Sequence, residues 1–481
     1  MQSTKSPVVI LMVMALVATA CGARLNDEQR AALASGGNGG AVGGTGSLDD
    51  GLGAGDPSRP VADPGGDGSG AVGGGGTSDS ASNGGSASAG GGPATVGGGG
   101  QVAVSCAADN GGATDTGVGP QTITLGNVSL LSGPIQGFAN TAVGATKAFM
   151  NYQNSLGGIC GRALDLEVAD DRFDSGANKS EHERLKSRVF AFVGSLSVVD
   201  DGGVAVLKNT NIPDVTLALS DLKLQLENNF APTPLDLEDG GNNAVGYATW
   251  LKVNKGITRY ALIWPGQATA RNRADGYRLD YNRAGLTNAY EAEVGVTETN
   301  YTPHASAICD AGADGLVLTT TLEVNGMARL TKALKQQGCL PQYSHFGAQA
   351  YGQQFIELAG DAADGVRILI SFDIIEGSTN ELTKQFAEWF TRTNPGLQPD
   401  FFAIQSWVAG HMLATAIAEA GAELTRDNVI AALEGLEDYT AEGMIAPITP
   451  GTKTGPECFL VAKVTGGAWA REEPAQGFIC P

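Results

Sequence analysis

Positive charge is scarce in this chain. Its 481 residues include 30 Lys and Arg against 51 Asp and Glu, which gives a formal net charge of −21. Nucleic acids and anionic membrane surfaces attract proteins through Lys and Arg, so this balance argues against both as partners. We expect the negative charge to keep the protein soluble, and it does not by itself indicate a cationic ligand.

The motifs of common enzyme classes are also missing. No Gly-x-Ser-x-Gly turn, Walker-type phosphate loop or His-Glu-x-x-His motif occurs, and Glu181-His182-Glu183 lacks the second histidine. The four histidines are widely separated, and no close pair of Cys or His recurs with zinc-site spacing. Asp170-Asp171 lies between a predicted strand and a predicted helix, where capping and solvation explain it. The sequence therefore predicts no catalysis, no metal and no cofactor.

The N-terminus has the pattern of an export signal. Lys5 supplies positive charge, residues 8–17 form an apolar core too short to span a bilayer as a mature helix, and small residues precede Cys21. A small-residue run ending in cysteine resembles the lipobox of bacterial lipoproteins, although Ala18 stands where leucine is more usual. The resemblance implies a signal peptide over residues 1–20 and a lipid on Cys21 as the only membrane attachment. An ordinary cleaved signal with a cysteine nearby is the alternative.

Residues 21–105 are expected to form a flexible linker. After a short helix-like stretch, Gly, Ser, Ala and Asp dominate as far as Gly100. Such a composition buries too little apolar surface to offset the entropy of ordering. A Gly-rich coil, with an end-to-end distance of about 5 to 6 Å times the square root of its length, would hold the folded part several nanometres from a membrane. Disorder without a purpose explains the composition equally well.

Six cysteines remain once Cys21 is assigned to the lipid, and an even remainder in an exported chain indicates disulfides. Of fifteen pairings, sequence neighbours suggest Cys106-Cys160, Cys309-Cys339 and Cys458-Cys480. Only the middle pair has a structural argument. Cys309 and Cys339 each precede a predicted strand, so they should lie at one edge of neighbouring parallel strands. A bridge there is sterically reasonable, and it requires Cα atoms within about 7 Å of each other.

About 360 residues follow Gln121, enough for two domains of ordinary size. The first part of this region alternates strand and helix patterns. The predicted strands are residues 122–131, 164–168, 189–193 and 214–219, and the predicted helices are residues 139–156, 178–187 and 202–209. This order predicts a parallel sheet covered by helices on both faces.

The alternation restarts after Asp239-Gly240-Gly241. Strands are predicted at residues 259–264, 290–294, 315–319, 342–346 and 365–371, and helices at residues 243–253, 268–284, 327–337 and 405–419. The sequence therefore predicts two successive α/β lobes of similar size.

In its order of landmarks, residues 121–470 resemble the type I periplasmic binding proteins of the leucine/isoleucine/valine-binding family, the solute receptors of ABC importers. The landmarks are Leu131-Ser132-Gly133-Pro134, Asn154-Ser155-Leu156-Gly157-Gly158-Ile159, Asp170-Asp171 before a helix start at Asp174, Phe192-Val193-Gly194, Ala359-Gly360-Asp361-Ala362-Ala363-Asp364-Gly365 and Phe401-Phe402-Ala403.

The resemblance implies an α/β fold of two doubly wound parallel-sheet lobes joined by a hinge. The first lobe would comprise residues 121–240 and 373–445, and the second residues 241–372 and 446–481. It also implies an extracytoplasmic, lipid-anchored monomer that captures a small polar ligand and delivers it to the permease subunits of an ABC transporter. A ligand that contacts both lobes favours the closed state.

The resemblance places the ligand contacts of the first lobe on loops that follow strands. The candidates are Ser132, Phe138, Ser195, Leu196, Ser197, Ala218 and Ser220. Phe138 would cover the ligand, Ser220 would hold its carboxylate and amine, and Ala218 would contribute a carbonyl. Alternatively, Ser195 and Ser197 cap a helix and Phe138 belongs to the core.

The candidates in the second lobe are Trp264, Thr269, Thr320, Glu323, and Ala348 and Gln349 in the turn over residues 346–349. Amino-acid binders of the family usually carry a carboxylate in this turn to pair with the ligand ammonium, and here Ala348 takes its place. A buried ammonium without a carboxylate is expensive. Unless Glu323 supplies the charge, an amide, a carboxylate or an apolar metabolite is as plausible a ligand as a branched-chain amino acid.

Two other functions stay open on the sequence. A sensory receptor of the same fold would bind a solute in the same way but dock onto a signalling protein in the membrane. An exported hydrolase would turn its ligand over and would lose activity on replacement of a cleft Ser or Asp.

Overall fold

The computed structural model describes residues 110–133, 137–233, 244–266, 268–295, 297–318, 324–345 and 347–481. All of them belong to one compact unit, Gly91–Pro481. The predictions for the signal peptide, Cys21, the linker and Cys106 concern residues outside these ranges.

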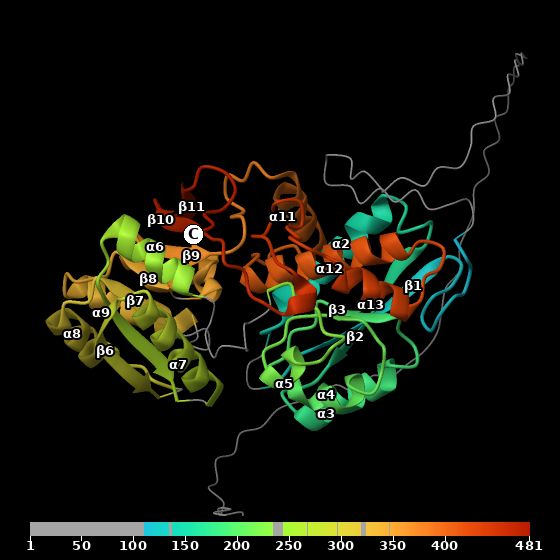
Figure 1. Cartoon of the computed structure of the whole chain (residues 1–481), viewed down its shortest axis with the longest axis horizontal. Helices are drawn as coiled ribbons and strands as arrows, with labels where there is room; N and C mark the ends of the chain where they lie inside the picture. The colour runs from blue at the N-terminus through green and yellow to red at the C-terminus, as the bar shows by residue number, and fades with distance from the viewer. Residues whose placement is uncertain are drawn as a thin grey trace, which may run out of the picture. The chain divides into compact units, whose positions relative to one another are not determined.

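Four parallel strands form the first sheet, in the order β2-β1-β3-β4 (Figure 1). They are β1 (Thr122–Ser129), β2 (Ala163–Asp170), β3 (Ala191–Val193) and β4 (Asp214–Val215). The helices that follow them are α2 (Asn140–Ser155), α3 (Ser175–Leu185), α4 (Asp201–Leu207) and α5 (Asp221–Leu224). Central β1 is buried from Leu125 to Ser129, as expected for a parallel strand covered on both faces. This alternation of strand and helix confirms the predicted α/β class.

A second helical layer of the first sheet comes from the C-terminal part of the chain. It consists of α11 (Glu381–Thr393), α12 (Phe401–Ala420) and α13 (Arg426–Glu434), of which α11 and α12 pack against α2. The Phe149 ring of α2 lies 5.2 Å from the Trp407 ring of α12. Gly410 allows this approach, because a Cβ atom there would lie 2.5 Å from the Phe149 ring. α12 is therefore a core helix.

By length and composition alone, α12 could also cross a membrane, and it is the one such helix in the described part of the chain. Its most apolar window is 78% buried inside the protein. The structure thus accounts for its apolar character by packing. The helix begins four residues before its predicted start because the Asp400 side chain accepts a hydrogen bond from Ala403 N, at 2.9 Å, and caps it.

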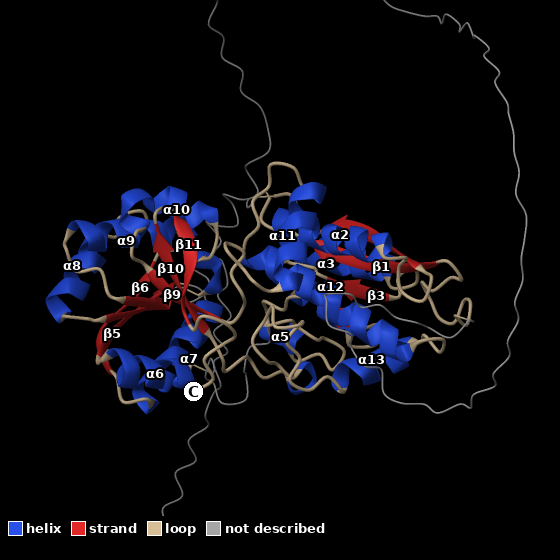
Figure 2. Ribbon diagram, turned by 90° about the horizontal axis from the view of Figure 1, so that it is seen from above, coloured by secondary structure: helices blue, strands red, loops and turns tan. Residues whose placement is uncertain are grey.

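The second sheet has seven strands in the order β11-β10-β9-β8-β7-β5-β6. They are β5 (Arg259–Pro265), β6 (Thr287–Val294), β7 (Gly315–Leu318), β8 (Tyr343–His345), β9 (Arg367–Ile370), β10 (Leu460–Thr465) and β11 (Ala468–Glu473). Helices α6 (Val245–Lys255) and α7 (Ala268–Arg283) lie on one side of it, and α8 (Thr302–Ala311), α9 (Val324–Gln336) and α10 (Gln353–Ala359) lie on the other (Figure 2).

One edge of this sheet departs from the predicted all-parallel arrangement. β10 runs antiparallel to β9, and β11 antiparallel to β10. Gly466 and Gly467, with φ of 61° and 83°, make the turn between β10 and β11. Two successive residues with positive φ match the right-handed twist of a hairpin, which favours glycine at both positions.

Two antiparallel segments connect the second sheet to the α11–α13 layer. Asp373 N donates to Met444 O and Ala446 N donates to Ser371 O, each at 2.8 Å. The Asp373 carboxylate accepts a hydrogen bond from the Arg471 guanidinium of β11 at 2.5 Å, which fixes one segment to the sheet edge. These segments lie where the sequence predicts that the chain crosses between the lobes for the second and third time. The lobe boundaries themselves stay a prediction, and the first crossing lies in residues 234–243, outside the described ranges.

Disulfides join Cys309 to Cys339, with Cα atoms 5.6 Å apart, and Cys458 to Cys480, with Cα atoms 4.3 Å apart. The structural argument for the first pair is confirmed, because β7 and β8, the strands that follow these cysteines, are parallel neighbours. The partner predicted for Cys160 is Cys106, which lies outside the described residues.

Candidate functional site

The carboxyl ends of the first sheet's strands gather most of the candidates of the first lobe. Ser132 follows β1, Ser195 to Ser197 follow β3, and Ala218 and Ser220 follow β4. Because the four strands are parallel, these loops leave the same edge of the sheet. Ligands of open α/β sheets bind at this edge, so the location suits the predicted role.

Backbone hydrogen bonds join the loops after β1 and β3. Leu130 N donates to Leu196 O at 3.0 Å, and Leu196 N donates to Ser129 Oγ at 3.0 Å. Ser195 Oγ accepts from Val128 N at 3.0 Å and is buried. The Ser195 hydroxyl therefore holds two strands together.

Neither Ser195 nor Ser197 caps a helix, so that alternative is wrong. Ser197 Oγ accepts from Val199 N at 3.1 Å, which closes a local turn two residues on. α4 begins after Asp200, whose side chain does not cap it. The Asp200 carboxylate is directed to another loop.

Asp200 anchors the loop after β4. Its carboxylate accepts from Leu219 N at 2.7 Å and from Ser220 N at 3.2 Å. The residue is 2% exposed. Burial raises the pKa of the Asp200 carboxyl, while the charge of Lys223 and the hydrogen bonds from Leu219 and Ser220 oppose that rise. Ser220 Oγ accepts from Lys223 N at 3.3 Å and caps α5.

Asp170 anchors the loop after β1 in the same way. It accepts from Leu131 N at 3.0 Å, from Ser132 N at 3.2 Å and from the Ser132 hydroxyl at 2.5 Å. Burial alone would raise the pKa of the Asp170 carboxyl, but these bonds and one from Arg172 N outweigh it, so the pKa lies below its usual value. Neither Asp170 nor the fully buried Asp171 is a solvated helix cap, which corrects the sequence-based interpretation; Asp174 caps α3.

Phe138 lies at the start of α2 and is half-buried. Its ring is 5.2 Å from the Phe402 ring, in the first turn of α12. It also packs against the apolar cluster that contains Leu196 and Leu217. One edge of the ring thus belongs to a small core, and its remaining exposure leaves room for a contact with a ligand. Ala218 belongs to a neighbouring small cluster with Leu224 and Ala231.

The candidates from the second sheet are only partly described. Trp264 is the penultimate residue of β5, and its Nε1 donates to Glu293 Oε2 at 3.3 Å. Thr269 lies in the first turn of α7. Thr320, Glu323 and the first residue of the 346–349 turn lie outside the described ranges, so the structure does not test whether Glu323 supplies a charge.

Ala348 and Gln349 begin a 3-10 turn, η1 (Ala348–Ala350), just after β8. Gln349 Oε1 is buried and accepts no hydrogen bond from any described residue. The next residue after the turn, Tyr351, donates through its hydroxyl to Glu376 Oε2 at 2.6 Å and accepts from Ile375 N at 2.7 Å. The turn is thereby tied to the segment that leaves the second sheet.

The first turn of α12 brings the two sets of candidates together. η1 packs against α12, and a Cβ atom built on Gly352 would lie 3.5 Å from the Asp400 Cβ atom. A row of aromatic rings also links the two sets of candidates. Successive rings have centroids 5.2 to 5.8 Å apart, and the row consists of Phe138, Phe402, Phe401, Phe372 and Tyr351. The sequence gives Phe401-Phe402 as a family landmark only, and its position between the candidates requires the structure.

Asp400, which caps α12, is enclosed at this junction. Its second carboxylate oxygen accepts from the Thr141 hydroxyl of α2 at 3.0 Å. Burial raises the pKa of Asp400 to about 6, against the effect of these hydrogen bonds. A carboxylate at this junction is thus used for structure.

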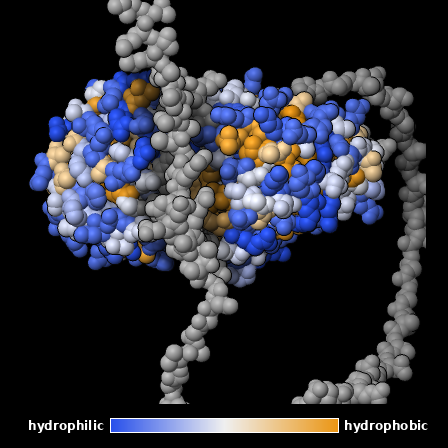
Figure 3. Space-filling view, turned by 90° about the horizontal axis from the view of Figure 1, so that it is seen from below, coloured by the Kyte–Doolittle hydropathy of each residue, from blue (hydrophilic) through white to orange (hydrophobic). Residues whose placement is uncertain are grey.

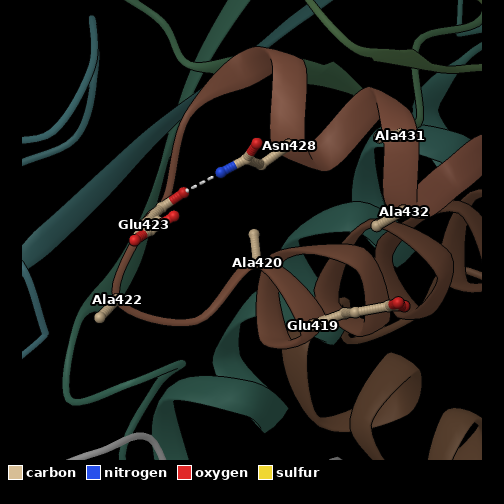
Figure 4. Close-up of a pocket in the computed structure, with 7 residues that line it drawn as sticks. All are labelled: Glu419, Ala420, Ala422, Glu423, Asn428, Ala431 and Ala432. Carbon is tan, nitrogen blue, oxygen red and sulfur yellow. Dashed lines mark hydrogen bonds between the residues drawn. The ribbon is translucent and has the colours of Figure 1, made fainter.

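Hydrophilic side chains cover most of the described surface that Figure 3 shows, with smaller hydrophobic areas between them. A depression at the opposite end of α12 is lined by Glu419, Ala420, Ala422, Glu423, Asn428, Ala431 and Ala432 (Figure 4). At 1.5 Å per residue, the length of α12 separates it from Phe402 by about 30 Å. Its one internal hydrogen bond, from Asn428 Nδ2 to Glu423 O at 2.8 Å, closes the loop before α13. Among the described residues, no group of three His, Cys, Asp or Glu side chains could hold a metal.

Known proteins with related sequences and folds agree with this architecture. The periplasmic binding protein family matches residues 122–468. Leu/Ile/Val-binding protein homolog 3 of Brucella melitensis is 24% identical over 202 residues, which cover 40% of this chain and 52% of that protein. The chain thus spans about half the length of this curated relative.

Two solved structures show the same fold at low identity. A fatty acid ABC transporter substrate-binding protein from Thermomonospora curvata has a TM-score of 0.63 and 18% identity, over 76% of this chain and 95% of that one. A branched chain amino acid ABC transporter from Thermus thermophilus with bound valine has a TM-score of 0.60 and 18% identity, over 75% and 97%. With the family match extending over most of both sheets, the chain belongs to the periplasmic binding protein family.

Proposed function

We propose that the protein is an extracytoplasmic solute-binding lipoprotein of an ABC importer. It captures a small polar ligand, such as an amino acid, an amide or a small carboxylate, between two lobes, and releases it unchanged to permease subunits. The lobes comprise residues 121–240 with 373–445 and residues 241–372 with 446–481. The lipid is on Cys21.

The observation that carries this proposal is the junction at the first turn of α12. Phe402 contacts Phe138 from one set of candidates, and Asp400 lies against Gly352, which follows the η1 turn of the other set. A solute at this junction would touch groups from both sheets. Binding to both favours one relative arrangement of the lobes, which is how a receptor signals that it is loaded.

Mass spectrometry of the material released from purified, denatured protein tests the proposal directly. We expect a bound small molecule, present in unmodified form. At a hundred times its dissociation constant, the added solute should stabilise the protein by about 2.7 kcal/mol. A candidate solute that is chemically changed after incubation would contradict the proposal.

Anchoring is tested separately with Cys21→Ser. The substitution removes the thiol that the lipid requires, so we expect loss of labelling by radioactive palmitate and release of the protein from the membrane fraction. Solute binding should be unchanged, because the folded region begins about ninety residues later along a Gly-rich linker. Membrane retention of the Cys21→Ser variant would show that the anchor lies elsewhere.

A further inference from the structure

The donor groups on the first sheet's carboxyl edge are occupied by the protein's own carboxylates. Leu131 N and Ser132 N donate to Asp170, as does the Ser132 hydroxyl. Leu219 N and Ser220 N donate to Asp200. Four backbone N–H groups and one hydroxyl of this edge are therefore already engaged and not free to bind an anion.

Arg172, in the loop after β2, is exposed to solvent, and the buried cations around this edge already interact with carboxylates of the protein. The Lys223 ammonium lies 3.5 Å from the Asp214 carboxylate and is 2% exposed. From the second sheet's helices, Arg273 interacts electrostatically with Asp221 of α5. A ligand carboxylate here would stand near Asp170 and Asp200 while its own hydration was removed, which is costly without a paired cation.

The exposed side chains of the same edge are apolar. Phe173 follows β2, Val198 follows β3 and Leu222 lies in the helix after β4, with 39%, 38% and 58% of their surfaces exposed. Phe138 adds a half-buried ring. Three of the four strands of this sheet, β2, β3 and β4, thus each lead to an exposed apolar side chain, which suits the apolar body of a solute.

The opposite turn offers a neutral acceptor. Ala348 has no charge, and the buried Gln349 Oε1 accepts no hydrogen bond from the described residues. A buried amide oxygen left unpaired is unfavourable, and a ligand N–H or O–H would supply the missing hydrogen bond. An uncharged donor satisfies this atom without introducing an ammonium that lacks a counterion.

We infer that the solute is an uncharged molecule with an apolar body and an amide or hydroxyl donor, and that Asp200 excludes ligands with a free carboxylate. This inference rests on the proposed function and narrows its ligand class. Asp200 acts as a specificity determinant, since it takes up donors of the loop after β4 that a carboxylate would need.

Four compounds with one carbon skeleton isolate the effect of charge. They are 4-methylpentanamide, which is neutral; 4-methylpentanoate, which is anionic; leucinamide, which is cationic; and leucine, which is zwitterionic. Titration calorimetry on the mature full-length protein should rank 4-methylpentanamide first, at least tenfold tighter than 4-methylpentanoate and leucine. Tighter binding of leucine or 4-methylpentanoate would overturn the inference and leave the proposed function intact.

Asp200→Asn tests the cause. The substitution removes the buried charge and should tighten 4-methylpentanoate binding at least fivefold, with little change for 4-methylpentanamide. Asp201→Asn is the matched control, because Asp201 is the exposed neighbour and does not contact the loop after β4. Equal effects of the two variants would refute the role of Asp200. If Asp200→Asn does not fold, the ranking on the unaltered protein decides.

A different set of results would refute the proposed function itself. If none of the four compounds binds and denaturation releases no solute, both the function and the inference are refuted. If a solute is released that the panel lacks, its chemistry decides: a free carboxylate contradicts the inference, and a neutral amide or alcohol supports it.

Discussion

Replacing Asp400 with asparagine should stabilise the protein at neutral pH. Asp400 caps α12 and is partly buried at the junction with α2 and Gly352. Burial raises the pKa of its carboxyl from 3.8 to about 6. Asparagine keeps an acceptor oxygen for Ala403 N and is as good a helix cap, but it has no charge to bury.

The size and sign follow from proton linkage. The folded state binds the Asp400 proton more tightly than the unfolded state does, so this group's contribution to the free energy of unfolding is complete below about pH 4 and is lost as the pH rises through about 6. A rise of about two pKa units corresponds to about 3 kcal/mol. The free energy of unfolding of Asp400→Asn should therefore exceed that of the unaltered protein by up to about 3 kcal/mol at pH 8, and by almost nothing at pH 4.

Urea denaturation followed by tryptophan fluorescence, repeated between about pH 4 and 8, measures this difference. Asp361→Asn is the control, because Asp361 is exposed and its substitution should leave the pH profile as it is. The reasoning is refuted if Asp400→Asn has the same pH dependence as the unaltered protein, or if it is the less stable of the two at pH 8.

Three further substitutions test the packing of both sheets by urea denaturation. Lys223→Met should destabilise the protein by about 3 to 5 kcal/mol, because it removes the ion-pair partner of the buried Asp214 carboxylate. Adding Asp214→Asn should restore most of this loss. Strictly additive losses of stability in the double variant would contradict the pairing. Replacing the Cys309–Cys339 disulfide with two serines frees a loop of 30 residues and should cost about 3 to 4 kcal/mol, whereas unchanged stability would speak against the chain-entropy account. Gly194→Ala would place a Cβ atom 2.1 Å from a side-chain oxygen of α2. It should cost clearly more stability than Gly312→Ala, because Gly312 has the same φ of 61° but open space around it. Equal losses of stability in the two variants would show that φ alone matters.

Strong local patterns explain why much of the fold could be predicted. β1 and α2 carry uninterrupted apolar periodicity, and the predicted ranges fall within two residues of the observed ones. The β10–β11 hairpin lies outside the predicted strands, although β10 carries a buried apolar run, whereas β11 has one large buried residue, Trp469, and ends in three charged residues. Its Gly466-Gly467 turn was the available signal.

The site was harder to predict, because it depends on contacts between distant loops. Sequence reasoning placed the serines in loops that follow strands, and the structure has them at the carboxyl ends of those strands. It did not show that Asp170 and Asp200 hold the backbone N–H groups of neighbouring loops, since loop conformation decides this. The pairing of Phe138 with Phe402 joins residues 264 positions apart, and no local pattern reports it.

The Tyr351 hydroxyl has a consequence for how specificity can change. It bonds both Glu376 Oε2 and Ile375 N, so the turn that carries Gln349 and the segment between β9 and α11 share one side chain. A solute that displaces the turn must also shift that segment. In the proposed two-lobed receptor, a different turn grafted to alter the preferred solute would therefore also disturb the link to the α11–α13 layer, and affinity and the arrangement of the lobes would have to be tuned together.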